Sequence, residues 1–389
     1  MGMLDNLVQL WDTFRILEVH SMTLETGLKL LTDYSSKLIE GCKKTAYDNT
    51  VLFTPDAVGN YDALWIRDFG YMAEYCGDLM NPEEIIGCIE YAIRGQREDG
   101  WMPDRMEAGG DAVYAAGAKG APVGRANLDN TPFLIFAVDA LFSRLDAGKA
   151  SVLFERWYPA LDRGMDILPV SAEGLIWNDP EDPHSPYGFT DTVCKTGKLF
   201  KESVLYWRAC RKMELLHSKF GCGDRANSYR GKSLLVEENL PLLFDKSEGV
   251  FPAAALDCRQ TDVWGMLYAL DVGFPFPAEN QSAMESWLLN NHSRYLYKGQ
   301  VCQLPDGAPW EKLLIDVPAG EYQNGAYWAT ASGWALRFFR ERDPVFFEKM
   351  LDELLACFRD EGIFECVNEG YQKLPQFVVS ATNARGGLL

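Results

Sequence analysis

Apolar residues along the chain recur mostly at helical spacing, at positions i, i+3, i+4 and i+7, and strand-like alternation is scarce. The pattern predicts a leading helix at about 3–20, followed by twelve helices at about 25–45, 62–78, 82–97, 128–145, 148–168, 198–220, 223–243, 261–272, 278–297, 322–341, 344–359 and 376–386. Short strands are expected only inside loops, as in GLIWND and GVFPAA. The sequence therefore predicts an all-α protein.

The connections between the predicted helices alternate between short and long. Short ones follow every second helix, as GDLMN, DAGK, GCG, VGFPFP and ERDP, and long ones follow the others. This alternation is typical of six helical hairpins that close into a double ring, an (α/α)6 barrel, here as a single domain over residues 1–389. Because loops on a rigid scaffold carry function, we expect the site at the rim that holds the long loops.

Tryptophan recurs in the long loops, beside carboxylates and amides. The residues concerned are Trp65, Trp101, Trp177, Trp264, Trp310 and Trp328. Aromatic faces stack on the C–H surfaces of sugars, and the polar neighbours match sugar hydroxyls. Each tryptophan alone could instead fill the core at a helix start. Their recurrence at one rim favours a carbohydrate pocket.

Charge and composition exclude several classes of partner. A net charge of −19 argues against binding to nucleic acid or an anionic membrane, and is compatible with a neutral small molecule. We expect a cytoplasmic protein, because we find no signal peptide and no run of about 20 apolar residues that could span a membrane. The ten cysteines are scattered without a CxxC pair and only four histidines occur, so we expect reduced thiols, no metal site and no cofactor.

Four segments, in chain order, resemble motifs of the six-hairpin glycosidases: LWIRDF, PYGFTDT, EYQNGAYW and FECVNEGY. The resemblance is closest to glycoside hydrolase families 63 and 37 (the trehalases), with the glucoamylases of family 15 more distant, and it spans nearly the whole chain. It implies an (α/α)6 barrel that hydrolyses a glycosidic bond with inversion and without a cofactor. Two of these segments depart from the family motifs. Phe189 and Thr190 precede Asp191 of PYGFTDT, where trehalases have a tryptophan directly before the aspartate, and Val367 of FECVNEGY stands in place of an aromatic residue.

Inverting hydrolysis needs a protonated carboxyl and an ionised carboxylate roughly 6.5–9.5 Å apart. In the family, PYGFTDT corresponds to the stretch with the general acid and FECVNEGY to the stretch with the general base. Their loops should lie half a turn apart on the ring, which suits Asp191 as acid and Glu365 as base. Burial against Tyr187 and Phe189, with repulsion from Asp179 or another carboxylate, would raise the pKa of the acid.

Other carboxyl groups remain possible for these two roles. The alternatives for the acid are Asp179 and Glu202, and those for the base are Glu369 and Glu321. Asp191 could also serve only in a turn, since T-D-T after glycine is favourable turn chemistry, and Glu369 could simply cap a turn before Gly370.

The LWIRDF segment supplies the main candidates for sugar binding. By resemblance, Asp68 would accept hydrogen bonds from two sugar hydroxyls while Arg67 orients it; alternatively the two form an ion pair at a helix start. The other candidate contacts are Asp104, Arg105, Asn127, Asp129, Asp179, Glu311, Glu321 and Asn324, with Glu311 at a leaving-group subsite. Asn127 or Asp129 could instead cap the fourth of the twelve helices, and Asp262 the eighth.

The prediction is an exo-acting hydrolase of a small α-linked glycoside or disaccharide, and four alternatives stay open. A sugar 2-epimerase needs two pocket histidines, and of the four only His184 lies on a long loop. An unsaturated-uronide hydrolase needs a cationic pocket, for which Arg105, Arg125 and Arg259 are available. A disaccharide phosphorylase would replace the base with an anion site. The last alternative is a non-catalytic sugar-binding barrel.

Overall fold

The computed structural model describes residues 24–118 and 121–389, so the predicted helix at 3–20 lies outside it. All twelve other predicted helices are present. They are residues 24–41, α2 (Ile66–Cys76), α3 (Pro82–Arg94), α4 (Asn130–Phe142), α5 (Ala147–Asp166), α6 (Phe200–Phe220), α7 (Gly223–Asn239), α8 (Val263–Asp271), α9 (Ala278–Asn290), α10 (Ser332–Arg342), α11 (Pro344–Asp360) and α12 (Val378–Gly386). Among the described residues, no helix is long and apolar enough to cross a membrane.

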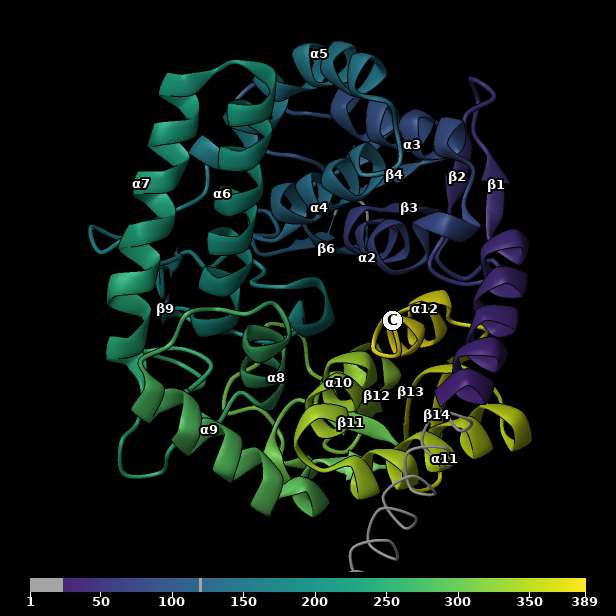
Figure 1. The fold of residues 1–389 in the computed structure, drawn as a ribbon, viewed down its shortest axis with the longest axis vertical. Helices are drawn as coiled ribbons and strands as arrows, with labels where there is room; N and C mark the ends of the chain where they lie inside the picture. Colours follow the sequence, from purple (N-terminus) through teal and green to yellow (C-terminus); the bar gives the residue numbers. More distant parts are fainter. Residues whose placement is uncertain (1–23, 119–120) are drawn as a thin grey trace, which may run out of the picture.

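The even-numbered helices form an inner ring. Each of α2, α4, α6, α8 and α10 contacts the next in this order, and α12 contacts α2 (Figure 1). The odd-numbered helices and residues 24–41 lie outside this ring. Every residue of α12 is buried, whereas α11 buries one face, which is what an inner and an outer position require. This is the predicted (α/α)6 architecture.

Short turns connect the inner helices to the following outer ones, as predicted. Asn81, Asp146 and Asp343 stand in these turns, and each side chain accepts a hydrogen bond from a backbone N–H in the first turn of α3, α5 or α11. Such caps satisfy N–H groups that have no partner inside the helix. Three outer helices therefore start where the sequence places a capping residue, whereas α7 and α9 start without a side-chain cap.

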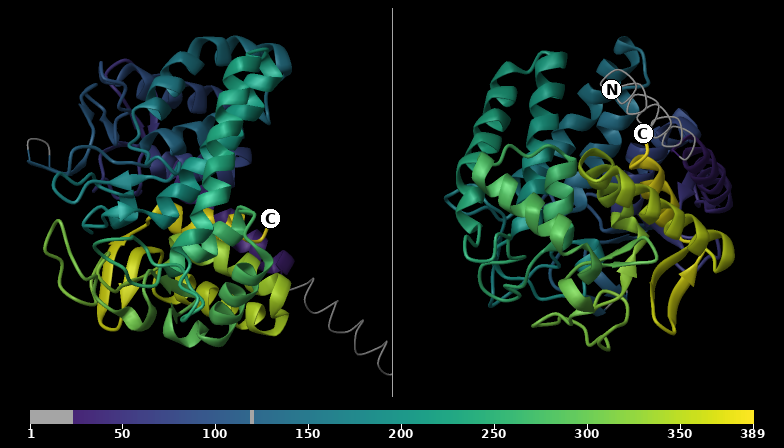
Figure 2. Two further views of the ribbon diagram at one scale, coloured as in Figure 1. Left: turned by 90° about the vertical axis from the view of Figure 1, so that its left-hand side faces the viewer. Right: turned by 60° about the horizontal axis from the view of Figure 1, so that its bottom comes forward.

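The long loops form small antiparallel sheets. One has five strands, in the order β10 (Leu296–Tyr297), β11 (Gln300–Cys302), β12 (Tyr327–Trp328), β13 (Phe364–Asn368) and β14 (Tyr371–Pro375). Another sheet joins three strands, β3 (Ala63–Trp65), β4 (Arg105–Glu107) and β5 (Ala112–Val113). The two-stranded sheets pair β1 (Lys43–Thr45) with β2 (Val51–Phe53), β6 (Ala116–Ala118) with β7 (Ala121–Val123), and β8 (Trp177–Asn178) with β9 (Gly197–Lys198). Figure 2 shows the strands and long loops gathered on one side of the helical ring.

The predicted helix over 322–341 is wrong over residues 322–328, and residues 329–331 form a 3-10 turn that leads into α10. Tyr327 and Trp328 form β12, and α10 begins only at Ser332. Tyr322 has φ 43° and Gly325 has φ 113°, both outside the helical region, so the backbone turns there and cannot continue a helix. Of the predicted strands, GLIWND supplies β8, while GVFPAA makes only isolated bridges.

Candidate active site

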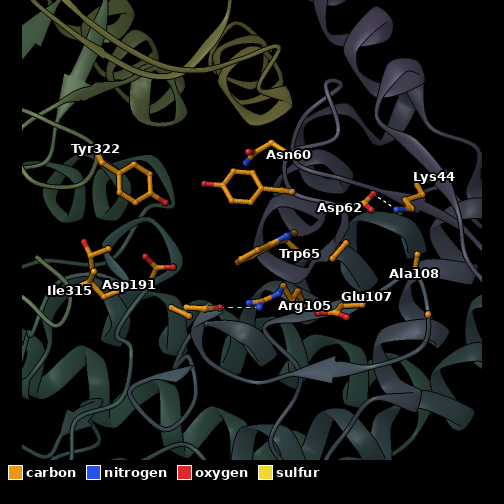
Figure 3. A pocket seen from close by; sticks show the side chains of 16 residues that line it. Lys44, Asn60, Asp62, Trp65, Arg105, Glu107, Ala108, Asp191, Ile315 and Tyr322 are labelled. Carbon is orange, nitrogen blue, oxygen red and sulfur yellow. Dashed lines mark hydrogen bonds and ion pairs between the residues drawn. The ribbon is translucent and has the colours of Figure 1, made fainter. Parts of the chain in front are cut away.

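Two adjoining pockets lie among the long loops. The inner pocket is lined by Pro55, Tyr61, Trp65, Arg67, Asp68, Gly188, Phe189, Asp191, Tyr322, Glu365 and Phe377. The outer pocket shares Tyr61, Trp65, Asp191 and Tyr322 with it and adds Lys44, Asn60, Asp62, Ala63, Arg105, Glu107, Ala108, Gly109, Ala116, Gly117, Thr192 and Ile315. In Figure 3, Asp191 and Tyr322 lie on one side of this space and Trp65 and Arg105 on the other.

Asp191 follows a short 3-10 turn at Gly188–Thr190, in the loop between α5 and α6. Its side chain is buried and accepts a 2.8 Å hydrogen bond from Nε2 of Gln323. Burial raises the pKa of Asp191 to about 7, and the charges of Asp104 and Asp129 add to this while Arg67 opposes it. The carboxyl can thus hold a proton near neutral pH.

Of the carboxylates considered for raising this pKa, Asp104 and Asp129 act on Asp191, and Asp179 lies elsewhere. Asp179 is exposed and accepts a hydrogen bond from the backbone N–H of Glu181, a turn contact. Glu202, the other alternative acid, is buried in an ion pair of 2.5 Å with Lys195. Neither Asp179 nor Glu202 lines a pocket. Of the three candidate acids, only Asp191 does.

Glu365 lies on β13 and reaches the inner pocket with a side chain that is 2% exposed. Its Oε1 accepts a 2.9 Å hydrogen bond from the Tyr61 hydroxyl, and Nζ of Lys373 lies 3.6 Å from its Oε2. Burial raises the pKa of Glu365 to about 7, although Lys373 and Tyr61 both act to lower it.

The alternative bases lie away from the pockets. Glu369 is exposed at the turn of the β13–β14 hairpin, which fits the turn role considered for it. Glu321 is half-buried, and its backbone forms a bridge with Asn324. Neither side chain lines the inner or the outer pocket.

Arg67 is held between two buried carboxylates and does not pair with Asp68. Its NH2 group lies 2.5 Å from Asp104, and its Nε lies 3.0 Å from Asp129. Asn127 donates a 2.9 Å hydrogen bond to Asp104. Because Asp104, Asn127 and Asp129 line neither pocket, the structure places them behind Arg67 and not at the sugar contacts predicted for them.

The same network supports the turn that carries Asp191. The backbone N–H of Gly188 donates a 3.0 Å hydrogen bond to Oδ2 of Asp129, and a Cβ on Gly188 would overlap the Arg67 guanidinium. Asp129 stands at the start of α4 but makes no capping hydrogen bond with its side chain. Asp262, in contrast, caps α8 as predicted, by a 2.7 Å hydrogen bond from Gly265.

Three buried polar atoms on residues that line the inner pocket have no hydrogen-bond partner within the described protein: Nε1 of Trp65, Oδ1 of Asp68 and Oε2 of Glu365, whose contact with Lys373 is an ion pair at 3.6 Å. Buried polar groups in folded proteins are almost always hydrogen-bonded. Burial, with the nearby Glu365 and Asp104, raises the pKa of Asp68 to about 8, although Arg67 opposes this shift. The inner pocket therefore offers hydrogen-bonding groups to a polar, uncharged ligand.

Of the six predicted tryptophans, only Trp65 lines the pockets, with the Arg105 guanidinium 4.7 Å from the centre of its ring. The remaining five hold the loops together. Trp101 packs on His184, Trp264 donates to Val301, Trp310 donates to Gln303 and Gln323, Trp328 donates to Tyr322, and Trp177 lies on β8. For Trp101, Trp264, Trp310 and Trp328, which are buried, the core role is the one that the structure supports, and Trp177 is half-buried outside both pockets.

The aromatic walls come instead from residues that were not predicted as sugar contacts, although Phe189 was expected beside Asp191. Tyr61, Tyr322, Phe189 and Phe377 all line the inner pocket. Tyr61 and Tyr322 lie within or next to the segments YDALWIRDF and EYQNGAYW, so their position beside a motif was the available signal. Gln323, which holds Asp191, was missed in the same way.

Two remaining candidates do not reach the pockets either. Glu311 is exposed and accepts a 3.2 Å hydrogen bond from the backbone N–H of Cys258. Asn324 is buried and accepts a 2.7 Å hydrogen bond from the backbone of Trp310. Arg105, in contrast, lines the outer pocket.

No protein-family model matches this sequence, and no curated protein matches it. Solved structures match it along nearly its whole length. An α-mannosidase of Streptococcus pneumoniae superposes with TM-score 0.68 and 10% identity over 96% of this chain and 97% of that one. Mannosylglycerate hydrolase of glycoside hydrolase family 63 from Thermus thermophilus, in complex with glucose, superposes with TM-score 0.66 and 15% identity over 92% of this chain and 99% of that one.

A glucoamylase of Saccharomycopsis fibuligera gives TM-score 0.64 and 13% identity over 94% of each chain. At these identities the likeness shows the fold. The chain shares its (α/α)6 architecture with glycoside hydrolases, as the resemblance of its motifs implied.

Proposed function

We propose that this protein is an inverting, exo-acting glycoside hydrolase that cleaves a small α-linked glycoside. The observation that carries the proposal is that Asp191 and Glu365, 174 residues apart in sequence by subtraction of their numbers, line the same inner pocket. Each is buried, and each has a pKa raised to about 7. A carboxyl pair around one sugar site is what inverting hydrolysis requires.

The two carboxyls receive different roles from their positions. Asp191 lines both pockets, so it lies at their junction, where a glycosidic oxygen between two subsites would lie. There it donates its proton to the leaving oxygen. Glu365 lines only the inner pocket and, when ionised, takes a proton from the water that attacks the anomeric carbon.

The inner pocket would hold the sugar that is released. Asp68 and Trp65 point hydrogen-bonding atoms without protein partners toward its hydroxyls, and Phe189 and Phe377 supply apolar surface. The outer pocket would hold the leaving group. Among the described residues, the two cations that line it are already paired, Lys44 with Asp62 and Arg105 with Asp104, which favours a neutral leaving group.

The alternatives have less support. No described histidine lines either pocket: His184 packs on Trp101, His217 pairs with Asp162, and His292 packs on Phe346. The sugar 2-epimerase alternative needs two histidines at the pocket. The paired state of Lys44 and Arg105 also disfavours a uronide or phosphate ligand, because an anion would compete with the existing ion pairs.

The test is a screen of small α-linked disaccharides and glycosides, with the configuration of the first product followed by NMR. We expect release of one non-reducing sugar as the β-anomer. A product that retains the α configuration would exclude the inverting mechanism, and release of internal fragments would exclude exo action. Binding of sugars without any product between pH 4 and 9 would identify a sugar-binding barrel instead.

A further inference from the structure

Lys373 stands directly behind the inner pocket. Its Nζ lies 3.6 Å from Oε2 of Glu365 and 3.0 Å from the centre of the Tyr322 ring. Its side chain is 31% exposed and lines neither pocket. Lys373 therefore contacts the proposed base and one wall of the pocket without reaching the ligand, and it can act only through these two neighbours.

The hairpin that carries both residues departs from regular geometry beside this contact. The register of β13 and β14 pairs Cys366 with Lys373 and Phe364 with Pro375. In a regular antiparallel pair, Lys373 would share the face of Cys366, and Glu365 would point to the other face. Leu374, next to Lys373, has φ 45°, in the left-handed region that a non-glycine residue rarely adopts. The approach of Lys373 to Glu365 thus coincides with a local break in the pleat.

Several ionisable groups surround Glu365. They are Asp56 and Tyr61 from the loop before β3, Asp68 from α2, Asp191 from the loop before α6, Tyr322 from the loop before β12, and Cys366, Tyr371 and Lys373 from the hairpin. Among the described residues, Lys373 is the one cation within ion-pair distance of Glu365. The carboxylates in this set favour a proton on Glu365, whereas the Tyr61 hydroxyl and Lys373 oppose it, and Lys373 is the one that does so with a charge.

Asp191 has different surroundings. Its hydrogen-bond donor is the neutral amide of Gln323. Arg67 also acts on it, but this guanidinium is already paired with Asp104 and Asp129, whose negative charges favour a proton on Asp191. The two carboxyls of the inner pocket therefore differ chiefly in their partners: a lysine beside one and an amide beside the other.

We propose that Lys373 is a positioning residue that assigns the single proton between the two carboxyls, keeping Glu365 ionised and leaving the proton on Asp191. The names acid and base in this proposal rest on the proposed function. Burial is the largest cause of the raised pKa in both groups, and the two values are similar, about 7, although Lys373 already lowers that of Glu365. Without Lys373 the shared proton would therefore shift toward Glu365. Only the form with protonated Asp191 and ionised Glu365 is competent for hydrolysis.

The first experiment compares the pH dependence of kcat/KM for the wild type, Lys373→Met and Lys373→Arg on a substrate found in the screen. In Lys373→Met, we expect the acidic limb of the kcat/KM profile to move up by about one pH unit, because Glu365 then ionises less readily. At acidic pH this shift corresponds to about a tenfold loss of kcat/KM. Lys373→Arg should keep the limb of the wild type. An unmoved limb in Lys373→Met would overturn the proposal.

Lys198→Met is the matched control. Lys198 is 29% exposed and pairs with Glu173 at 3.0 Å, so the same exchange removes a similar ion pair outside the pockets. We expect it to leave the pH profile unchanged. A shift as large as that of Lys373→Met would mean that the effect reflects overall charge, which would also overturn the proposal.

A second experiment needs no substrate. The midpoint of thermal unfolding is measured at pH 4 and pH 8 for the wild type, Lys373→Met, Glu365→Gln and the double variant. Lys373→Met should lower the midpoint more at pH 8 than at pH 4, where Glu365 is protonated and has no ion pair to lose. In the Glu365→Gln background this pH dependence should vanish.

An equal loss at both pH values, or one that persists in the Glu365→Gln background, would show a merely structural role for Lys373 and overturn the proposal. These measurements separate the two proposals. If no glycoside is cleaved, the proposed function fails, while the unfolding measurements still decide whether Lys373 controls the ionisation of Glu365.

Discussion

The two loops that supply the carboxyls of the inner pocket are built differently. Asp191 follows a 3-10 turn in an irregular loop, and Gln323 and the Arg67–Asp129 pair hold that turn in place. Glu365 lies on a β-hairpin, between a tyrosine hydroxyl and a lysine ammonium. Nevertheless, the pKa of each carboxyl is raised to about 7.

This comparison separates two physical effects. Burial is the largest cause of the raised pKa in both groups, because it disfavours a charge whatever the loop that presents it. The partner of each carboxyl decides what it can do afterwards. The amide of Gln323 lowers the pKa of Asp191 by a hydrogen bond without bringing a charge, whereas the cation beside Glu365 favours its ionised form by charge as well.

The largest effect should come from removing either carboxyl. Asp191→Asn and Glu365→Gln keep size and polarity but cannot exchange the proton, so each should lower turnover by roughly 10²–10⁴-fold. Steady-state kinetics on a cleaved substrate, with circular dichroism to confirm folding, checks this. Asp179→Asn and Glu369→Gln are the matched controls, because both residues are exposed and outside the pockets. Near-normal turnover in both pocket variants would refute the assignment.

The turn before Asp191 should be nearly as sensitive. In Gly188→Ala, the new methyl group would overlap the Arg67 guanidinium and push the Asp191 turn away. We expect an activity loss of about 10²-fold, since a displacement of about 1 Å can cost that much, together with a lower unfolding midpoint. Gly231→Ala is the control, because its methyl group would meet open space in α7. Equal behaviour of the two variants would contradict this account of the turn.

The raised pKa values also predict how stability depends on pH. Between about pH 4 and pH 7, folded Asp191 and Glu365 hold protons that the unfolded chain releases, so the free energy of unfolding should fall as pH rises through this window. Asp191→Asn should remove its share, on the order of a few kcal/mol, and gain stability relative to the wild type at pH 8 but not at pH 4. Thermal unfolding of the wild type and Asp191→Asn across this pH range checks the prediction. A stability difference between them that does not change with pH would contradict it.

The smallest effect concerns the hydrogen bond between Tyr61 and Glu365. Tyr61→Phe removes the hydroxyl that lowers the pKa of Glu365, so activity below neutral pH should fall by about tenfold, while stability changes by only about 1 kcal/mol. Tyr114→Phe, which loses a 2.9 Å hydrogen bond to Gly95 outside the pockets, is the control. A uniform loss at all pH values would indicate that Tyr61 binds substrate without affecting Glu365.

The sequence by itself determined the helices and their order. Helical periodicity and capping residues act locally, and the alternation of short and long connections follows from hairpins that must pack side by side, so these features can be recognised without a structure. The motif segments also identified the loops that meet at the inner pocket, including those of Asp68, Asp191 and Glu365.

Only the tertiary structure decided which side chains face that pocket. Trp264 and Trp328 look like sugar contacts in sequence, yet they fill the core, while Tyr61 and Tyr322 line the site. The backbone turn at Tyr322 and the strands in the loops depend on pairing between segments far apart in the chain. The partners of Glu365 likewise come from two such segments, and their charges can be combined only once folding has brought them within reach of one carboxylate.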